Sequence, residues 1–224
     1  MSLPVSPDYL AKALHDGCRV KDLTLTHQRI GDLLLPTGEL VACDPFVFSD
    51  GKPFSQLFPR GVFPVILSIA QIATDQRVAF ATVKFRETPP VAWEMLTIGD
   101  QDISKRKDGK LFGYSVDAAT GCFMDQSAER ALDDLMAEQD MLFFETVTAE
   151  KEQETFFDTM TAEMDKTYRP TWSWLDMSFG DTNLIAFSSG YGDGLYATYA
   201  GFGSDGAVSV AVTDFSVIPL ENNA

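Results

Sequence analysis

The residues of this chain best suited to chemistry are aspartates that lie in predicted turns or at the ends of predicted strands. They are Asp44, Asp117, Asp125, Asp193 and Asp214. When two or three such carboxylates converge, they bind Ca²⁺ or Mg²⁺ through hard oxygen ligands. Two close carboxylates also form an acid/base pair, because the charge of one raises the pKa of the other. Each aspartate also suits a structural role, in which it caps a helix or accepts backbone hydrogen bonds in a turn.

A second group of candidates surrounds residues 188–194, whose sequence is Ser-Ser-Gly-Tyr-Gly-Asp-Gly. Glycine permits positive φ angles and close backbone approach, so three glycines in five residues predict a tight turn. Ser189, Gly192, Asp193 and Tyr196 are therefore candidate ligand-binding residues. The tyrosines that flank the predicted turns can stack on a small ligand: Tyr114, Tyr191, Tyr196 and Tyr199. A plain hairpin tip and cross-strand aromatic packing are the alternative interpretations.

Motifs of common enzyme families are absent from the sequence. Its two histidines, His15 and His27, lie near the N-terminus, and we expect both to be solvated or at the edge of the core. The sequence has no Gly-x-Ser-x-Gly elbow, no phosphate-binding Gly-Lys-Ser/Thr loop and no His-Glu-x-x-His pair. The glycines of residues 190–194 precede a predicted strand, so they do not form a dinucleotide-binding turn.

The three cysteines, Cys18, Cys43 and Cys122, are odd in number, and their spacing fits neither a disulfide framework nor a zinc site. We expect Cys43 and Cys122 to be buried structural thiols, as is typical of a reducing compartment. The N-terminal residues lack a signal pattern, and no apolar run reaches the roughly 18 residues of a membrane span. The expected location is the cytoplasm.

The chain is strongly acidic, with a net charge of −16 and an isoelectric point near 4.3. This charge repels nucleic acid and anionic membrane surfaces, so neither is an expected partner. Between Asp125 and Asp165 the sequence has thirteen acidic and two basic residues, a net charge of −11. This segment is either a solvated face or a surface for a basic protein partner. The one compact basic run, residues 105–107, is predicted to lie in a solvated loop.

Hydrophobic periodicity and turn residues predict the elements that must position these candidates. Helices are expected over residues 5–18, 125–138 and 148–168, and a hairpin is expected within residues 31–44. The other predicted strands cover residues 62–72, 77–85, 91–98, 111–116, 184–188, 195–202 and 207–217. This pattern predicts an α+β fold that is mainly antiparallel β-sheet, as a curved sheet or two-layer sandwich, with two or three peripheral helices. We expect a single domain over residues 1–224, with residues 1–30 as an N-terminal helix and lead-in and residues 125–168 as an acidic helical segment within it.

Four groups of short sequences together resemble a known family. They are Leu35-Pro36-Thr37-Gly38 with Ala42-Cys43-Asp44-Pro45, residues 113–117 with 121–125, residues 186–190 with 192–194, and Val212-Thr213-Asp214-Phe215. In this order they are similar to the bacterial family labelled domain of unknown function 4241. The resemblance covers residues from about 30 to about 217. It implies one continuous fold and carries no established activity, so it assigns no catalytic residue.

Scarce histidine, the absence of catalytic motifs and the concentrated negative charge favour a non-catalytic binding or interaction module. Its expected partner is a basic protein or a small ligand, and the sequence does not determine its oligomeric state. The alternative is a hydrolase that uses the aspartates, with or without Ca²⁺ or Mg²⁺ as cofactor.

Overall fold

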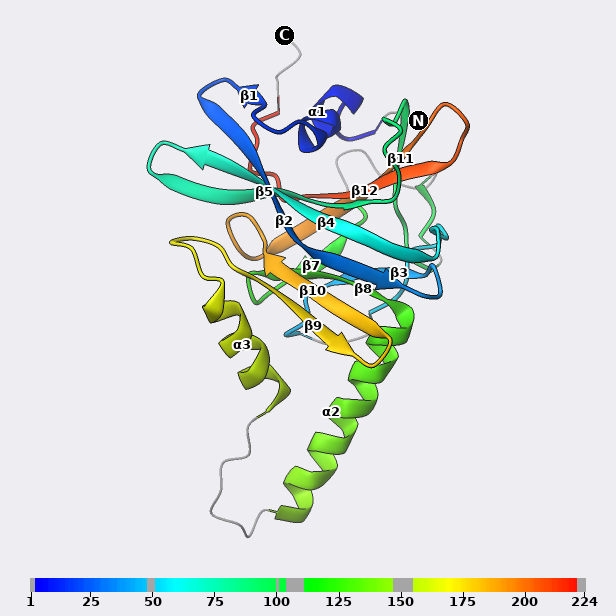
Figure 1. Ribbon diagram of the computed structural model, residues 1–224, viewed down its shortest axis with the longest axis vertical. Helices are drawn as coiled ribbons and strands as arrows, with labels where there is room; N and C mark the ends of the chain where they lie inside the picture. Colours follow the sequence, from blue (N-terminus) through cyan, green and yellow to red (C-terminus); the bar gives the residue numbers. More distant parts are fainter. Residues whose placement is uncertain (1–2, 48–50, 100, 104–110, 147–154, 221–224) are drawn as a thin grey trace.

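Two antiparallel β-sheets packed against one another form the body of the protein (Figure 1). The computed structural model describes residues 3–47, 51–99, 101–103, 111–146 and 155–220, without the side chains of residues 138–146. Helices lie on the outer side of each sheet. The predicted α+β class with mainly antiparallel sheet is confirmed.

The larger sheet has eight strands in the order β1-β2-β4-β5-β12-β11-β6, with β7 also paired to β11. Their bounds are β1 Arg19–Val20, β2 Leu23–Leu35, β4 Gly61–Ile72, β5 Asp75–Lys84, β6 Ala92–Met95, β7 Tyr114–Val116, β11 Gly194–Phe202 and β12 Val208–Asp214. Strands β6 and β7 share one edge of β11, where β7 pairs with the first part of β11 and β6 with the last. This arrangement places β7 beside the start of β11, close to the glycine-rich turn of residues 188–194.

The smaller sheet has four strands in the order β3-β8-β10-β9. Their bounds are β3 Leu40–Cys43, β8 Thr120–Asp125, β9 Trp174–Phe179 and β10 Thr182–Ser188. Side chains alternate between its faces, so Phe123 and Phe187 pack against the larger sheet whereas Cys122 and Met124 pack against helices. Asn183 joins the sheets, because its amide donates to the Asp32 carbonyl at 3.0 Å and accepts from the Leu34 N–H at 2.7 Å.

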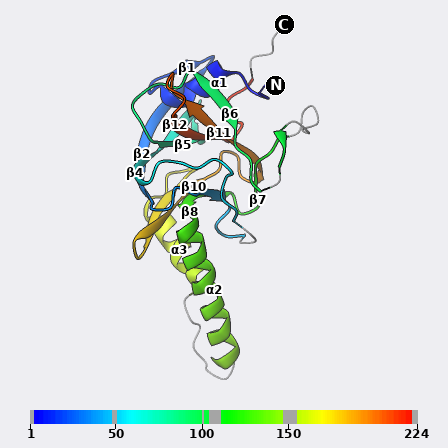
Figure 2. The same cartoon turned by 90° about the vertical axis from the view of Figure 1, so that its right-hand side faces the viewer.

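Three helices cover the sheets. Helix α1 (Pro7–Ala11), which continues as a 3₁₀ turn over Lys12–Leu14, lies on the outer face of the larger sheet. Helices α2 (Gln126–Thr146) and α3 (Phe156–Lys166) lie under the smaller sheet, and α2 projects well beyond it (Figure 2). The Phe and Met stripe of α3 faces the sheet, with Met160 fully buried, so it is core packing. No helix among the described residues is long and apolar enough to cross a membrane.

The hairpin expected within residues 31–44 is wrong. Strand β2 pairs with β4, whereas β3 pairs with β8 in the other sheet, so residues 36–39 cross between the sheets as an arch. The side chain of Asp125 holds this arch, accepting hydrogen bonds from the Thr37 backbone N–H at 3.0 Å and from its hydroxyl at 2.8 Å. Turn residues predict that the chain bends locally, but they do not determine which strand pairs with the strand on each side of the bend.

Other boundaries also differ from the expected ones. The first helix ends at Leu14 rather than residue 18, the second continues to Thr146, and the third covers Phe156–Lys166. Strand β9 was not predicted, because its alternation is weak at this edge of the sheet. It pairs with β10 across a turn at Gly180, where φ is +58°. The hairpin turn at residues 203–206 joins β11 and β12 as expected.

Candidate ligand pocket

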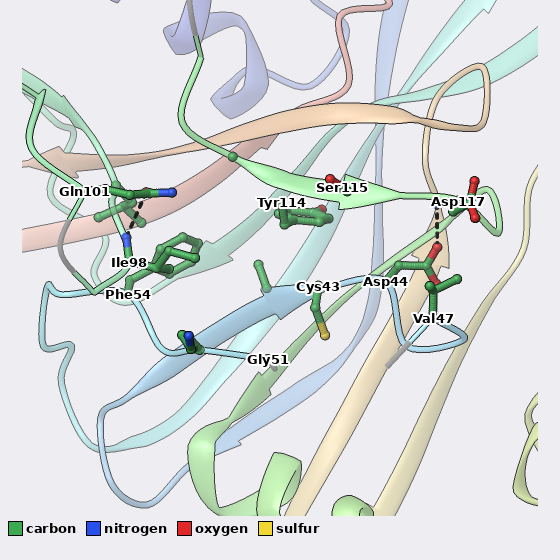
Figure 3. Close-up of a pocket in the computed structure, with 14 residues that line it drawn as sticks. Cys43, Asp44, Val47, Gly51, Phe54, Ile98, Gln101, Tyr114, Ser115 and Asp117 are labelled. Atoms are coloured by element: carbon green, nitrogen blue, oxygen red, sulfur yellow. Dashed lines mark hydrogen bonds between the residues drawn. The ribbon is translucent and has the colours of Figure 1, made fainter. Parts of the chain in front are cut away.

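A cavity of about 320 Å³ lies at one end of the seam between the two sheets (Figure 3). Strand β3 of the smaller sheet forms one side, and β7 of the larger sheet forms the other. Four stretches of chain supply its lining, from residues 42–47, 51–54, 96–101 and 113–117. The segment before Phe54 runs along the free edge of β3, with a hydrogen bond of 2.9 Å from the Phe54 N–H to the Leu40 carbonyl.

The lining combines apolar walls with a few polar groups. Phe54, Leu96 and Ile98 provide apolar surface. The side-chain oxygen of Gln101 accepts from the Ile98 N–H at 3.1 Å, which leaves its amide nitrogen pointing into the pocket (Figure 3). Lys52 also lines the pocket. The walls therefore suit an apolar group, and the amide and ammonium donors suit a hydrogen-bond acceptor.

Asp44, one of the predicted site residues, is a structural residue at the edge of the pocket. It is 3% exposed, and its carboxylate accepts three backbone hydrogen bonds. The donors are the N–H groups of Asp117 at 2.9 Å, Ala118 at 2.7 Å and Phe46 at 2.9 Å. These bonds satisfy the charge of Asp44 and tie the end of β3 to the turn that follows β7 (Figure 3).

Asp117 lines the same pocket and differs from Asp44 in its surroundings. Its side chain is exposed at the pocket mouth, and no described residue donates a hydrogen bond to its carboxylate. The backbone around it is fixed by Asp44, so the position of the Asp117 carboxylate is constrained. Of the predicted aspartates, Asp117 is the one that lines the pocket with a carboxylate that accepts no hydrogen bond from the described residues.

The glycine-rich turn is closed by its own hydrogen bonds. The Ser189 hydroxyl and the Tyr196 hydroxyl both donate to the Gly192 carbonyl, at 2.8 and 2.7 Å. Gly192 adopts φ +113°, which only glycine adopts easily. Burial, and then the charge of Asp193, raise the pKa of Tyr196. The polar groups of Ser189, Gly192 and Tyr196 are therefore used to shape the turn.

This turn lies against the turn that carries Asp117. The Asp193 carboxylate accepts from the Ala119 N–H at 3.1 Å, and the Ser189 N–H donates to the Ala119 carbonyl at 3.1 Å. Asp44, Asp117 and Asp193 are thus linked through one short stretch of backbone, residues 117–119. They meet through backbone groups, and their carboxylates do not share a ligand site.

Asp125 and Asp214 lie apart from these three aspartates. Asp125 is fully buried at the other end of β8, about 17 Å along the strand from Thr120. It caps α2 by accepting from the Ser127 N–H at 2.9 Å, in addition to holding the arch. Asp214 accepts from the Tyr9 hydroxyl at 3.1 Å and from the Ser216 N–H at 2.8 Å, beneath α1. The described residues contain no group of three His, Cys, Asp or Glu residues that could hold a metal ion.

Sequence reasoning missed part of the pocket. Phe54 and Gln101 line the pocket, and no local sequence pattern marks their side chains as pocket residues. Cys43 and Cys122 were expected to be buried structural thiols. Cys122 is buried, but Cys43 is partly exposed, and the two lie side by side on β3 and β8. The basic run at residues 105–107 lies outside the described residues.

The two histidines line a second, smaller cavity of about 190 Å³ on the outer face of the larger sheet. Lys84 and Arg86 also line it, but both are engaged in ion pairs, Lys84 with Glu87 and Arg86 with a residue of the β11–β12 turn. Burial lowers the pKa of His27. His27 is therefore at the edge of the core, as expected, and away from the larger pocket.

A family model described as "Protein of unknown function (DUF4241)" matches residues 33–213 of the 224 residues. This chain belongs to the DUF4241 family. The DUF4241 match begins near the end of β2 and continues to β12, so it contains every residue that lines the larger pocket. It confirms the resemblance to the domain of unknown function 4241. The comparisons with curated proteins and with solved structures found no match.

Proposed function

We propose that this DUF4241 protein is a non-catalytic binding module, in the bacterial cytoplasm, whose larger pocket takes a small ligand with an apolar body and a cationic group. The observation that carries the proposal is a pocket of about 320 Å³ with apolar walls and, at its mouth, the Asp117 carboxylate, to which no described residue donates a hydrogen bond. Ligand pockets have volumes of about 300 to 1,000 Å³, mostly apolar walls and a few placed polar groups. The three free thiols support a reducing location.

The polar groups of the pocket define the expected chemistry of the ligand. Asp117 offers a carboxylate to an amine or guanidine, whereas the oxygens of Asp44 are already used. The Gln101 amide and Lys52 offer donors to an oxygen on the same ligand. The net charge of −16 favours the approach of cations over that of anions.

Fragment binding measured by ligand-observed NMR tests this proposal. The library contains three groups of compounds with similar aromatic bodies, which carry amines or guanidines, neutral amides, or carboxylates. We expect the amines and guanidines to bind, and Asp117→Asn to weaken them about tenfold, because it removes a charge-assisted hydrogen bond worth about 1.5 kcal/mol or more.

Asp181→Asn is the matched control, because Asp181 is also an exposed aspartate in a turn, between β9 and β10. It removes the same charge and should leave fragment binding unchanged. Equal affinities of Asp117→Asn and Asp181→Asn, or preferential binding of carboxylates, would contradict the proposal.

Binding of a basic protein is a second candidate function, favoured by the acidic surface of the helices. The described acidic side chains there include Asp133 and Asp134 on α2 and Asp158 and Asp165 on α3, all exposed. Since the apolar stripe of α3 is buried against the sheet, recognition through this surface would be electrostatic. A basic partner captured from native lysate at low salt and released at high salt would support it, and a chain that elutes alone at both salts would count against it.

The hydrolase alternative remains a prediction that uses the same pocket. Asp117 would act as its acid or base, and a panel of ester, phosphodiester and glycoside substrates, with and without Ca²⁺ or Mg²⁺, tests it. Turnover that Asp117→Asn abolishes and Asp181→Asn retains would favour this alternative over simple binding.

A further inference from the structure

Two thiols face each other across neighbouring strands of the smaller sheet. Cys43 on β3 is the register partner of Cys122 on β8, and their sulfur atoms are 3.5 Å apart. Directly opposite residues of antiparallel strands have Cα atoms about 4.5 to 5.5 Å apart. A disulfide needs a Cα separation of about 4.4 to 6.8 Å, so the backbone is already spaced for one.

The two thiols differ in access. Cys122 is fully buried beside Met124 in the core between the sheet and the helices. Cys43 is partly exposed and lies at the margin of the same core, with its sulfur directed away from Tyr114 (Figure 3). An external reagent therefore reaches Cys43 first, and Cys122 is placed to react with whatever Cys43 has bound.

We propose that Cys43 and Cys122 form a reversible cross-strand disulfide, with a low-molecular-mass disulfide as the oxidant. The thiolate of Cys43 attacks one sulfur of the oxidant, forming a mixed disulfide and releasing the first thiolate. The thiolate of Cys122 then attacks the Cys43 sulfur, forming the Cys43–Cys122 bond and releasing the second. The protein dithiol loses two electrons and two protons, and the oxidant becomes two thiols.

The surroundings of Cys43 predict slow exchange at neutral pH. The hydrogen bond with Cys122, burial, and the charges of Asp44 after β3 and Glu129 on α2 all raise the pKa of Cys43. The Tyr114 hydroxyl is neutral at these pH values, because burial raises its pKa well above the usual range. The thiolate is the attacking species, and the pKa of a free thiol is about 8.5. Because the pKa of Cys43 is higher than that, oxidation should accelerate throughout the rise from pH 7 to pH 9.

Thiol counting in glutathione buffers tests the inference on the full chain. Reduced protein is incubated over a series of ratios of oxidised to reduced glutathione, quenched in acid, denatured and alkylated with a maleimide. Of the three cysteines, all should be labelled at reducing ratios and only Cys18 at oxidising ratios. Peptide mapping should then show a Cys43–Cys122 link that dithiothreitol removes.

Three variants separate the two steps. Cys122→Ser should accumulate a glutathione adduct on Cys43, because the resolving thiol is missing. Cys43→Ser should leave the buried Cys122 unmodified, and Cys18→Ser should form the link as the wild-type chain does. Circular dichroism checks that each variant is folded, and wild-type labelling decides alone if one is not.

Two results would overturn the inference. One is complete labelling of all three cysteines at every glutathione ratio. The other is a stable glutathione adduct on wild-type Cys43 without a Cys43–Cys122 peptide. Neither result depends on ligand binding in the pocket, so this inference and the proposed function succeed or fail separately.

Discussion

The carboxyl group of Asp214 lies in a buried site between β12 and α1, where it accepts a hydrogen bond from Tyr9. Burial raises the pKa of Asp214 to about 6. The hydrogen bonds from Ser216 and Tyr9 lower this pKa, but their effect is smaller than that of burial. The folded protein therefore prefers the protonated form of this aspartate more than the unfolded chain does.

The raised pKa of Asp214 predicts a pH-dependent effect of Asp214→Asn. In the wild-type chain, the stabilisation that comes from protonated Asp214 is complete below about pH 4 and is lost as the pH rises through about 6. Asn resembles the protonated acid, so Asp214→Asn should match the wild type near pH 4 and exceed it near pH 8 by up to about 3 kcal/mol. Urea unfolding at both pH values measures the difference. Asp181→Asn, the charge-matched control, should show no such gain at the higher pH.

At the scale of elements, the turn between β10 and β11 packs closely against Phe215, which directly follows β12. Gly190 lies in this turn with φ +56°, and a Cβ atom there would lie 2.9 Å from the Cβ of Phe215. Gly180, in the turn between β9 and β10, has nearly the same φ of +58° but no atom within 4 Å of such a Cβ. The two glycines therefore share one backbone requirement and differ in packing.

Comparing Gly190→Ala with Gly180→Ala separates these two effects. Gly180→Ala should cost about 1 kcal/mol, because the left-handed conformation is strained for residues with a Cβ. Gly190→Ala should cost about 3 kcal/mol, because overpacking against Phe215 adds about 2 kcal/mol. Denaturant unfolding measures both free energies. Equal losses of unfolding free energy in the two variants would show that the contact between this turn and Phe215 tolerates an added methyl group.

The whole molecule carries its charge unevenly. Residues 125–165 contain most of the net charge of −16, and helix α2 of this segment projects beyond the smaller sheet (Figure 2). In this segment Glu163 forms an ion pair with Lys166, at the end of α3. Self-repulsion among these carboxylates should therefore oppose folding at low ionic strength.

Raising NaCl from about 10 mM to about 300 mM should stabilise the protein by about 1 kcal/mol, because it shortens the Debye length from about 30 Å to less than 10 Å. Calorimetry should show this as a rise in Tm of about 3 °C. Replacing the exposed Asp133 and Asp134 by lysine should reduce the salt effect. A Tm that is the same at both salt concentrations would contradict self-repulsion.

Alternation of hydrophobic residues and the glycine-containing turns determined most strands, the helical nature of residues 126–146 and 156–166 and the α+β class, because these signals depend on neighbours in the sequence. The tertiary structure decided which edges pair. In it β3 pairs with β8 rather than with β2, and Cys43 contacts Cys122, which lies 79 residues further along the chain. It also assembled the pocket from four separate stretches. Such choices depend on satisfying every buried strand edge and face at once, and no local pattern contains that information.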